Sequence, residues 1–265
     1  MEFLPRTAIV TGSDSGIGRA TAVALAEAGM DVGITWHSDR AGAEHTAGQV
    51  RAAGRKAVIR RLDTTDIPGC AAVVDDLAEA LGRVDVFVNN AGAGDGTSFL
   101  DLGHKIWAGT MDINLNGAFL CIQAAARRMV AAGTGGRIIA VTSVHETQPK
   151  VHAAAYVAAK HGLGGLIKTI ALELAEHGIT ANSVAPGAIS TPMSGQDGDD
   201  PEPTVHPGIP LGRSGRASEI AAVIAFLASP ASAYVTGASW AVDGGILQMG
   251  PMGGARLGNN SWRQG

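Results

Sequence analysis

Short apolar segments rich in β-branched residues alternate along this chain with longer, alanine-rich segments whose apolar positions recur at the helical period. Several short segments are continuously apolar, which is typical of strands covered on both faces. Because the two kinds of segment alternate over the whole length, the sequence predicts one α/β domain with a doubly wound parallel sheet. Strands are predicted at 7–12, 31–35, 57–63, 84–90, 136–143, 179–187 and 239–245, and helices near 16–28, 39–53, 67–81, 103–131, 152–177 and 217–228.

The composition is that of an ordinary soluble protein. The chain has 265 residues, 46% of them hydrophobic and 17% charged, so it can bury a substantial core. A net charge of −4 argues against a nucleic-acid partner, which would favour a basic face. The chain has no signal-peptide layout and no apolar run long enough to span a membrane. Cys70 and Cys121 suit buried thiols in a reducing compartment, so we expect a cytoplasmic protein without membrane contact.

A glycine-rich segment, "TGSDSGIG" at 11–18, follows the first predicted strand and opens the first predicted helix. Gly12, Gly16 and Gly18 leave room for a pyrophosphate to approach the backbone, and the N–H groups of the helix can receive its charge. In a doubly wound sheet, ligands bind at the carboxyl ends of the strands, where this segment lies. The segment therefore predicts a dinucleotide site.

Tyr156 and Lys160 lie four residues apart in an alanine-rich predicted helix, so they share one face. A phenol has a pKa of ~10, and lowering it to ~7 needs roughly 4 kcal/mol of preference for the phenolate. An ammonium about 4 Å away contributes on the order of 4 kcal/mol at an effective dielectric near 20. Helped by the positive charge of an oxidised dinucleotide, the lysine can therefore make the phenol a usable acid/base, whereas an isolated helix would favour a packed tyrosine beside a solvated lysine.

These motifs, in this order and spacing, resemble the classical short-chain dehydrogenases/reductases. The resemblance runs from about residue 7 to residue 245 and includes "NNAG" at 89–92 and "PGAIST" at 186–191. It also includes Asn114 in "INLNG", Ser143, and the Tyr156–Lys160 pair. "TSVHE" at 142–146 and "YVTG" at 234–237 look like the glucose 1-dehydrogenase branch.

The resemblance implies a single-domain Rossmann-type fold at 1–250, a substrate lid near 190–216 and a C-terminal tail at 251–265. It implies an NAD(P)(H)-dependent oxidoreductase that transfers hydride between nicotinamide and an alcohol or carbonyl substrate. Tyr156 would be the acid/base, Ser143 would hold the reacting oxygen, and Asn114 would support a water that links Lys160 to solvent. The implied cofactor contacts are Gly12, Ser15, Gly16, Ile17, Gly18, Trp36, His37, Ser38, Asp63, Asn90, Ala91, Gly92, Tyr156, Lys160, Pro186, Gly187, Ile189 and Thr191.

The end of the second predicted strand bears on the choice between NAD and NADP. A carboxylate there would hold the ribose 2′-hydroxyl of NAD and repel a 2′-phosphate. The sequence instead has Thr35, Trp36, His37 and Ser38 at that place, with Asp39 better placed as the cap of the next helix. Hydroxyls and an imidazole accept a phosphate, so we expect NADP(H) to be favoured with NAD(H) possible, although the glycine-rich segment carries no basic residue.

The substrate is less constrained than the cofactor. Acidic residues at 197, 199, 200 and 202 disfavour a negatively charged substrate or carrier protein. His145 and Met193 are expected to contact a small polyol, sugar or ketone, with Glu146 either a second contact or half of a surface pair. Two alternatives stay open: a 3-ketoacyl-carrier-protein reductase, although Leu172 stands where such enzymes present an arginine, and a non-catalytic dinucleotide-sensing regulator. No spacing of His, Cys and Asp predicts a metal site.

Small residues surround Tyr156 in its helix, at 153–155, 158, 159, 162, 164 and 165. Such residues allow another helix to approach closely, and the family pairs this region across a two-fold axis. We therefore expect a homotetramer. The tail at 251–265 carries Trp262, which predicts docking on a neighbouring subunit rather than a frayed end.

Overall fold

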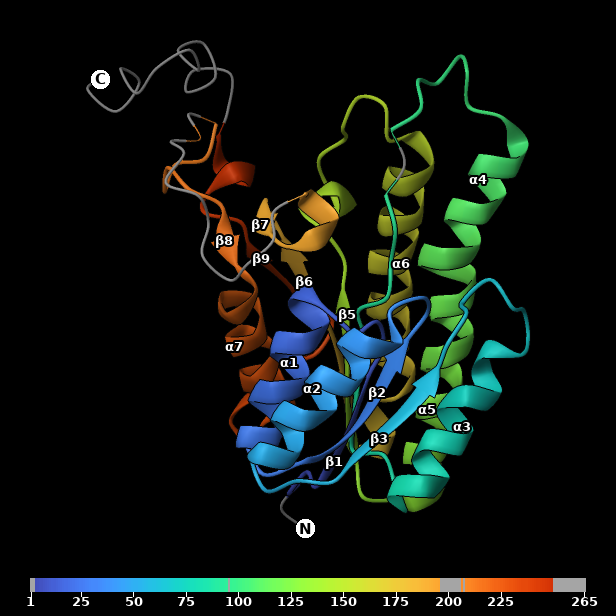
Figure 1. The fold of residues 1–265 in the computed structure, drawn as a ribbon, viewed down its shortest axis with the longest axis vertical. Helices are drawn as coiled ribbons and strands as arrows, with labels where there is room; N and C mark the ends of the chain where they lie inside the picture. The colour runs from blue at the N-terminus through green and yellow to red at the C-terminus, as the bar shows by residue number, and fades with distance from the viewer. Residues whose placement is uncertain (1–2, 95, 196–205, 207, 250–265) are drawn as a thin grey trace.

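The computed structural model describes residues 3–249 except 95, 196–205 and 207. The lid predicted near 190–216 therefore falls partly outside the described residues, and the predicted tail falls wholly outside them. Seven parallel strands form one central sheet in the order β3-β2-β1-β4-β5-β6-β9 (Figure 1). The predicted doubly wound parallel sheet of a single-domain Rossmann-type fold is confirmed.

Each central strand begins and ends within two residues of its predicted bounds, except the last one, which ends three residues early. Most strands end earlier than predicted because hydrogen bonding to the neighbouring strand stops where the chain turns toward the next helix. The strands are β1 (Thr7–Val10), β2 (Asp31–Trp36), β3 (Ala57–Arg61), β4 (Val86–Asn89), β5 (Gly136–Val141), β6 (Ile179–Pro186) and β9 (Ser239–Val242). A second, two-stranded sheet, β7 (Ile189–Ser190) with β8 (Gly215–Arg216), joins the two ends of the 190–216 segment.

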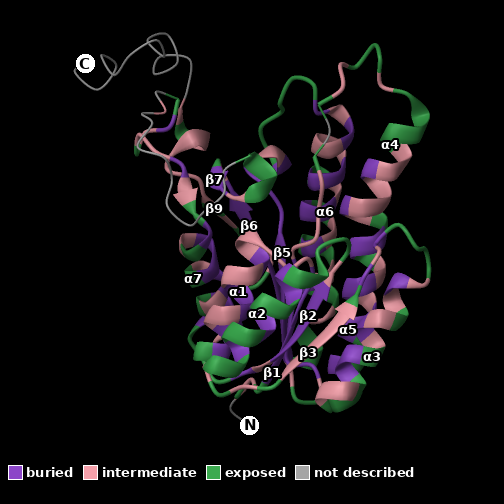
Figure 2. Ribbon diagram, in the orientation of Figure 1, coloured by how far each residue is buried: buried purple, intermediate pink, exposed green. Residues whose placement is uncertain are grey.

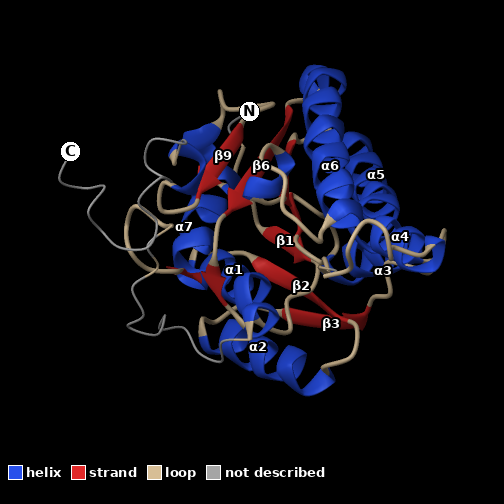
Figure 3. Ribbon diagram, turned by 90° about the horizontal axis from the view of Figure 1, so that it is seen from above, coloured by secondary structure: helices blue, strands red, loops and turns tan. Residues whose placement is uncertain are grey.

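Helices cover both faces of the sheet, giving three layers (Figure 3). One layer consists of α1 (Gly16–Glu27), α2 (Arg40–Ala52) and α7 (Ala217–Ala228), and the other of α3 (Cys70–Leu81), α4 (His104–Met111), α5 (Gly117–Ala132) and α6 (Ala154–Glu173). Successive strand residues face opposite layers: Ile9 belongs to the core under α3, α5 and α6, and Val10 to the core under α1, α2 and α7. Buried residues accordingly line both faces of the strands (Figure 2).

The single helix predicted at 103–131 is two helices joined by a π-helical segment, Asp112–Asn116. The helical period continues through this segment, so the sequence pattern does not reveal it. π-helical segments are frequent at functional sites. Here the segment carries Asn114, which is fully buried.

The sheet order reverses at β1, which pairs with β2 on one side and β4 on the other. The chain therefore leaves β1 and β4 toward different layers, and a crevice opens at their carboxyl ends. The glycine-rich segment follows β1, and the NNAG segment spans the end of β4. The fold thus brings these two predicted cofactor segments side by side.

Candidate active site

The glycine-rich turn needs its glycines at three places for different reasons. Gly12 and Gly16 have φ of +59° and +50°, a region that residues with a side chain rarely adopt. A Cβ on Gly16 would also lie 3.2 Å from the methyl carbon of Thr191. A Cβ on Gly18 would collide with the carbonyl oxygen of Gly12. The turn is therefore an open backbone cradle at the N-terminus of α1, which suits a pyrophosphate.

Thr11 connects this turn to the segment after β4. Its hydroxyl accepts hydrogen bonds from the backbone N–H groups of Asn90 and Ala91, both at 2.9 Å. The Asn90 side chain donates to the carbonyl oxygens of Thr11 and Gly12, at 3.0 and 2.9 Å. Asn90 thus holds the glycine turn in place, in addition to the cofactor contact predicted for it.

Thr35, near the end of β2, lies against the same turn and is only 1% exposed. Its hydroxyl accepts a hydrogen bond from the N–H of Gly12 at 2.9 Å, and its backbone pairs with Ser13. The hydroxyl that we expected to be available to a phosphate is therefore already used in shaping the turn. Trp36, the next residue and the last of β2, is only partly buried.

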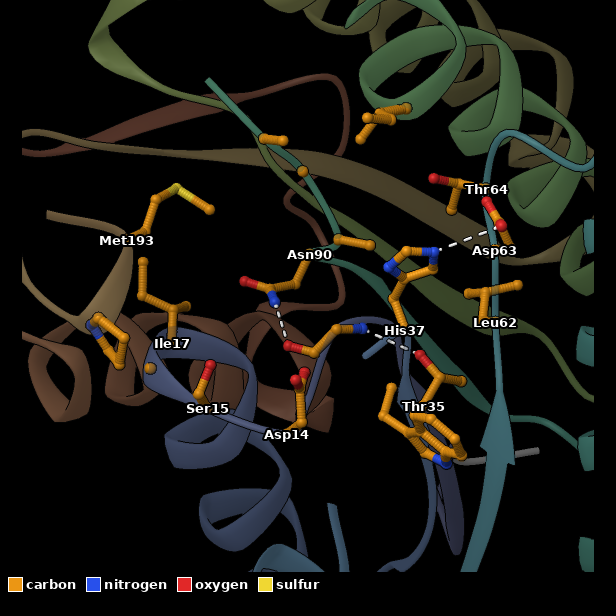
Figure 4. A pocket seen from close by; sticks show the side chains of 18 of the residues that line it. Asp14, Ser15, Ile17, Thr35, His37, Leu62, Asp63, Thr64, Asn90 and Met193 are labelled. Carbon is orange, nitrogen blue, oxygen red and sulfur yellow. Dashed lines mark hydrogen bonds and ion pairs between the residues drawn. The ribbon is translucent and has the colours of Figure 1, made fainter. Parts of the chain in front are cut away.

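A cavity of about 600 Å³ runs from the end of β2 past the glycine turn to the segment after β4. Figure 4 shows His37 and Asp63 on one side of this cavity and Met193 on the other. Sequence reasoning missed the contributions of Asp14, Thr64, Ala93 and Ile113. The predicted residues that line it are Gly12, Ser15, Gly16, Ile17, Thr35, Trp36, His37, Asp63, Asn90, Ala91, Gly92, Thr191 and Met193.

His37 and Asp63 form one wall of the cavity at its β2–β3 end. Nε2 of His37 lies 3.3 Å from Oδ2 of Asp63. Asp63 also accepts hydrogen bonds from the hydroxyl and the N–H of Thr65, which, together with His37, lower the pKa of its carboxyl group. Asp63 therefore caps the turn after β3 and also lines the cavity. Arg61, which sequence reasoning did not consider, hydrogen-bonds the carbonyl oxygen of His37 at 3.1 Å.

Asp14 is a second acid on the cavity wall. Burial raises the pKa of its carboxyl group, and the nearby Asp39 raises it further. Asp39 itself caps α2 as predicted, accepting a hydrogen bond from the N–H of Gly42 at 2.8 Å. The sequence signal for Asp14 was its place inside the glycine-rich segment, between two positions expected to touch a phosphate.

At the other end of the cavity, Gly92 and Ala93 lie against the buried Asn114 and Lys160. The Asn114 amide donates to the carbonyl oxygen of Ala93 at 2.8 Å, and its Oδ1 accepts from the Ala93 N–H at 3.3 Å. The same amide donates to the carbonyl oxygen of Thr110 at 2.9 Å. A Cβ on Gly92 would lie 2.8 Å from Oδ1 of Asn114 and 3.5 Å from Nζ of Lys160. Gly92 thus allows these side chains to approach the backbone.

Lys160 is 3% exposed and donates a hydrogen bond to the carbonyl oxygen of Val141 at 3.1 Å. Its ammonium lies 5.5 Å from the centre of the Tyr156 ring. Burial lowers the pKa of Lys160 to about 8, against an opposing contribution from Glu146. The one-turn spacing predicted from the sequence therefore does bring the two side chains together.

The acid/base argument made from the sequence is incomplete for Tyr156. Burial raises the pKa of its phenol, and a hydrogen bond with the side chain of Ser143 lowers it only in part. The argument from charge alone omitted the cost of burying both partners. A lowered phenol pKa thus needs a further positive charge, which an oxidised nicotinamide carries.

His145 follows Ser143 by two residues, and its ring meets that of Tyr156 edge-on, with centroids 6.4 Å apart. Its Nδ1 lies 2.9 Å from the carbonyl oxygen of Gln148. Because a carbonyl oxygen only accepts, Nδ1 carries the proton of the neutral ring and Nε2 is its acceptor nitrogen. Glu146, by contrast, is only 8% exposed, so it is not half of a surface pair.

The remaining predicted contacts lie beside the cavity rather than on its wall. Ser38 is exposed, Pro186 is buried, and Ile189 packs in the core under α7. A Cβ on Gly187 would lie 2.8 Å from the backbone of Asp243. Gly187 therefore allows β6 and the segment after β9 to pack closely.

The small residues of α6 serve packing within the subunit. A Cβ on Gly162 would lie 2.9 Å from Leu115, and one on Gly164 would lie 2.9 Å from Glu146. Only Gly165 among the helix's glycines faces open space in the described structure. Gly162 and Gly164 therefore serve packing within the subunit, and the interface predicted for this helix stays a prediction.

Three further features concern the part of the chain that the structure describes. No helix there is long and apolar enough to cross a membrane. The described His, Cys, Asp and Glu side chains also include no group of three that could hold a metal ion. Cys70 and Cys121 are buried free thiols, as expected.

Comparison with known proteins links this geometry to a family. Residues 12–247 match the family described as enoyl-(acyl carrier protein) reductase. The crystal structure of acetoin dehydrogenase YohF from Salmonella typhimurium is 50% identical, with 94% of this chain and 98% of that one covered and a TM-score of 0.90.

Two curated relatives show how varied the substrates of similar chains are. L-rhamnose 1-dehydrogenase (NAD(P)(+)) of Azotobacter vinelandii is 41% identical, covering 93% of this chain and 98% of its own. The 3-oxoacyl-[acyl-carrier-protein] reductase of Synechocystis is 38% identical, covering 91% and 97%. None of these three is a glucose dehydrogenase, so the finer resemblance noted in the sequence stays a prediction.

Proposed function

The chain belongs to the classical short-chain dehydrogenase/reductase family and is an NAD(P)-dependent oxidoreductase of alcohol and carbonyl groups, and we propose that its substrates are small α-hydroxy ketones and vicinal diols. The observation that carries the proposal is that Tyr156 is hydrogen-bonded to the side chain of Ser143 and packs edge-on against the ring of His145. Ser143 and Tyr156 can contact the reacting oxygen of the substrate, and His145 can hydrogen-bond a neighbouring hydroxyl.

The residues present fit a nicotinamide dinucleotide. The open cradle formed by Gly12 and Gly16 would hold the pyrophosphate, because a side chain at either place would fill it. His37 and Asp63 would contact the adenosine half, and Thr191, next to Gly16, would hold the carboxamide of the nicotinamide. When bound, the nicotinamide supplies the hydride acceptor for alcohol oxidation.

The chain's own residues would handle the proton. Tyr156 as phenolate takes the proton of the substrate hydroxyl, and returns it in the reductive direction. The Ser143 hydroxyl donates a hydrogen bond to the substrate oxygen as it gains carbonyl character. Lys160, charged and buried, stabilises the phenolate, and Asn114 holds the segment of Gly92 and Ala93 beside it.

His145 supports an α-hydroxy ketone over a simple ketone. With Nδ1 donating to Gln148, its Nε2 can accept a hydrogen bond from a second substrate hydroxyl. A simple ketone offers no such donor. The proposal also accords with the name of the Salmonella structure, since acetoin is an α-hydroxy ketone. A reductase of acyl carrier protein is disfavoured, because the position where the resemblance implies an arginine holds Leu172, which is 81% exposed.

We propose that NADP(H) is the preferred cofactor and that NAD(H) is also accepted. No carboxylate is contributed by residues 35–38, and His37 and Arg61 lie at the rim beside Asp63. Asp14 opposes a phosphate, so the preference should be modest.

A panel of acetoin, vicinal diols, sugars and simple ketones, each with both cofactors, tests the function. We expect the highest kcat/KM with a vicinal diol or α-hydroxy ketone. His145→Phe should abolish that advantage over a simple ketone while the simple ketone's rate is kept. Equal rates on both classes in the parent enzyme would contradict the proposed substrate class.

We also propose that the protein is a cytoplasmic homotetramer. Support comes from an apolar groove of about 570 Å³ between the outer faces of α5 and α6, lined by residues that include Phe119, Leu166 and Ile170. Phe119 is 41% exposed, which is costly for an aromatic ring on a helix. In light scattering, Phe119→Glu should give smaller particles, whereas Leu100→Glu, at a 93% exposed loop position, should not. A monomeric parent at micromolar concentration would refute the assembly.

A further inference from the structure

Glu146 is a buried acid for which the mechanism above has no use. It ends the short helical turn Val144–Glu146, three residues after Ser143, and is 8% exposed. The Ser239 hydroxyl of β9 donates a hydrogen bond to its Oε1. Its Oε2 is buried and has no hydrogen-bond partner among the described residues. A carboxylate buried in this way is costly unless a positive charge compensates it.

Lys160 is the cation on the face of α6 that Oε2 of Glu146 approaches. Oε2 faces α6, because a Cβ on Gly164 would lie only 2.9 Å from it. Tyr156, Lys160 and Gly164 follow one another at four-residue intervals, so they lie along one face of α6. The carboxylate therefore lies next to Lys160 on this face, in the space that Gly164 leaves open because it has no side chain.

The surroundings of Lys160 contain few other charges. Val141, Gly92 and Asn114 contribute neutral groups from β5, the segment after β4 and the π-helical segment. Tyr156 is the titratable neighbour on α6, and His145 packs against the Tyr156 ring rather than against the ammonium. Burial lowers the pKa of Lys160 to about 8, and the field of Glu146 is what opposes that shift.

We propose that Glu146 is a positioning residue whose buried negative charge keeps Lys160 protonated beneath Tyr156, with Gly164 providing the space for it. It touches neither substrate nor cofactor and acts through Lys160 alone. The inference rests on the proposed function in so far as the Tyr156–Lys160 pair is the acid/base. Glu146 also links β9, through its hydrogen bond from Ser239, to the reacting end of the cavity.

The direct test is the titration of Lys160 in Glu146→Gln. The chain has five lysines, so NMR of enzyme labelled at the lysine ε-carbon gives few signals, and loss of one in Lys160→Arg assigns it. We expect a midpoint of about 8 in the parent. Removing the carboxylate charge should lower this midpoint by at least about 0.5 unit, a threefold change in the protonation constant. Glu27→Gln, an exposed site at the end of α1, should leave it unchanged.

The result that would overturn the proposal is an unchanged Lys160 midpoint in Glu146→Gln. Glutamine has the shape of a neutral carboxylic acid, so a protonated Glu146 would give that result. Gly164→Ala provides a second route if Glu146→Gln folds poorly. Its Cβ must displace Oε2, so the midpoint should fall, whereas Gly165→Ala, which faces open space, should leave it unchanged.

Kinetics separate this role from a structural one. In alcohol oxidation, the alkaline limb of the kcat/KM profile, where Lys160 loses its proton, should move to lower pH by the same amount as the NMR midpoint. A purely structural role would lower the rate equally at every pH, and that result would contradict the proposal. If the parent oxidises no alcohol, the proposed function fails, and the NMR titration still decides the coupling of Glu146 to Lys160.

Discussion

The two ends of the cavity differ in how their polar groups are held. At the β2–β3 end, the side chains of His37 and Asp63 are 61% and 30% exposed and meet each other at the rim. At the reacting end, Asn114 and Lys160 are 0% and 3% exposed, and each is hydrogen-bonded to backbone. Exposed polar groups can be exchanged at little cost, whereas buried ones must all be satisfied together.

This difference separates cofactor choice from chemistry. Changes at the β2–β3 end should alter which cofactor is preferred and leave turnover with the better cofactor largely intact. Changes at the reacting end should lower turnover with both cofactors alike. Each of the following variants tests one side of that division.

The largest effect is expected from Tyr156→Phe. The ring keeps its packing, but the acid/base group is lost, so turnover should fall at least ~10²-fold with either cofactor. Cofactor affinity, measured by fluorescence titration, should stay within about twofold, because the β2–β3 end is untouched. Full turnover in a correctly folded Tyr156→Phe enzyme would refute the proposed mechanism.

The division also marks what the sequence predicted well. Strands covered on both faces are visible as apolar runs, and the order of motifs places them at the right strand ends. The resemblance to the short-chain dehydrogenases/reductases named Asn114, Ser143, Tyr156 and Lys160 together, and the structure brings these four residues together.

What the sequence could not predict are partners that lie far along the chain. Thr35 looked available to a phosphate, yet its hydroxyl is bound to the N–H of Gly12, 23 residues away. Glu146 was predicted to be either a substrate contact or half of a surface pair, yet its hydrogen-bond partner is Ser239, 93 residues away. The pairing of β7 with β8 involves two residues in each strand, too few for any periodic pattern.

The next largest effect is expected from Trp36→Asp. Trp36 is the cavity-lining residue at the end of β2 that is not fully buried, so a carboxylate there would meet a 2′-phosphate. Charge repulsion should move the ratio of kcat/KM toward NAD by at least about tenfold. Trp36→Asn is the matched control for loss of the indole and should give a much smaller shift.

The same substitution at Thr35 should instead destabilise the protein, because it places a carboxylate in a 1% exposed site. Thermal unfolding distinguishes the two positions. A parent enzyme that prefers NAD by tenfold or more would contradict our interpretation of this strand end.

A smaller effect, on turnover alone, is expected from Gly92→Ala. The new Cβ would lie 2.8 Å from Oδ1 of Asn114, so the amide must move within a fully buried site. We expect turnover to fall about tenfold with both cofactors, the scale of a modest overpacking strain. Gly94→Ala, with nothing within 4 Å of its Cβ, should leave turnover unchanged. A change in cofactor preference instead of turnover would contradict the division.

The smallest effect is expected from Asp14→Asn. Asp14 lines the cavity, so its charge disfavours a 2′-phosphate, and the variant should raise the NADP to NAD ratio of kcat/KM by about threefold. Asp39→Asn removes a charge that does not line the cavity and keeps a residue able to cap α2, so it should change the ratio less.

The pH dependence of this last effect gives it a specific signature. Because burial raises the pKa of Asp14, the parent's carboxylate is neutralised at a higher pH than an ordinary aspartate. Below that pKa, parent and Asp14→Asn both present a neutral group and should have the same cofactor ratio. Above it the ratios should diverge, with the variant favouring NADP. A difference that is constant across pH would mean that Asp14 acts through the shape of the glycine turn rather than through its charge.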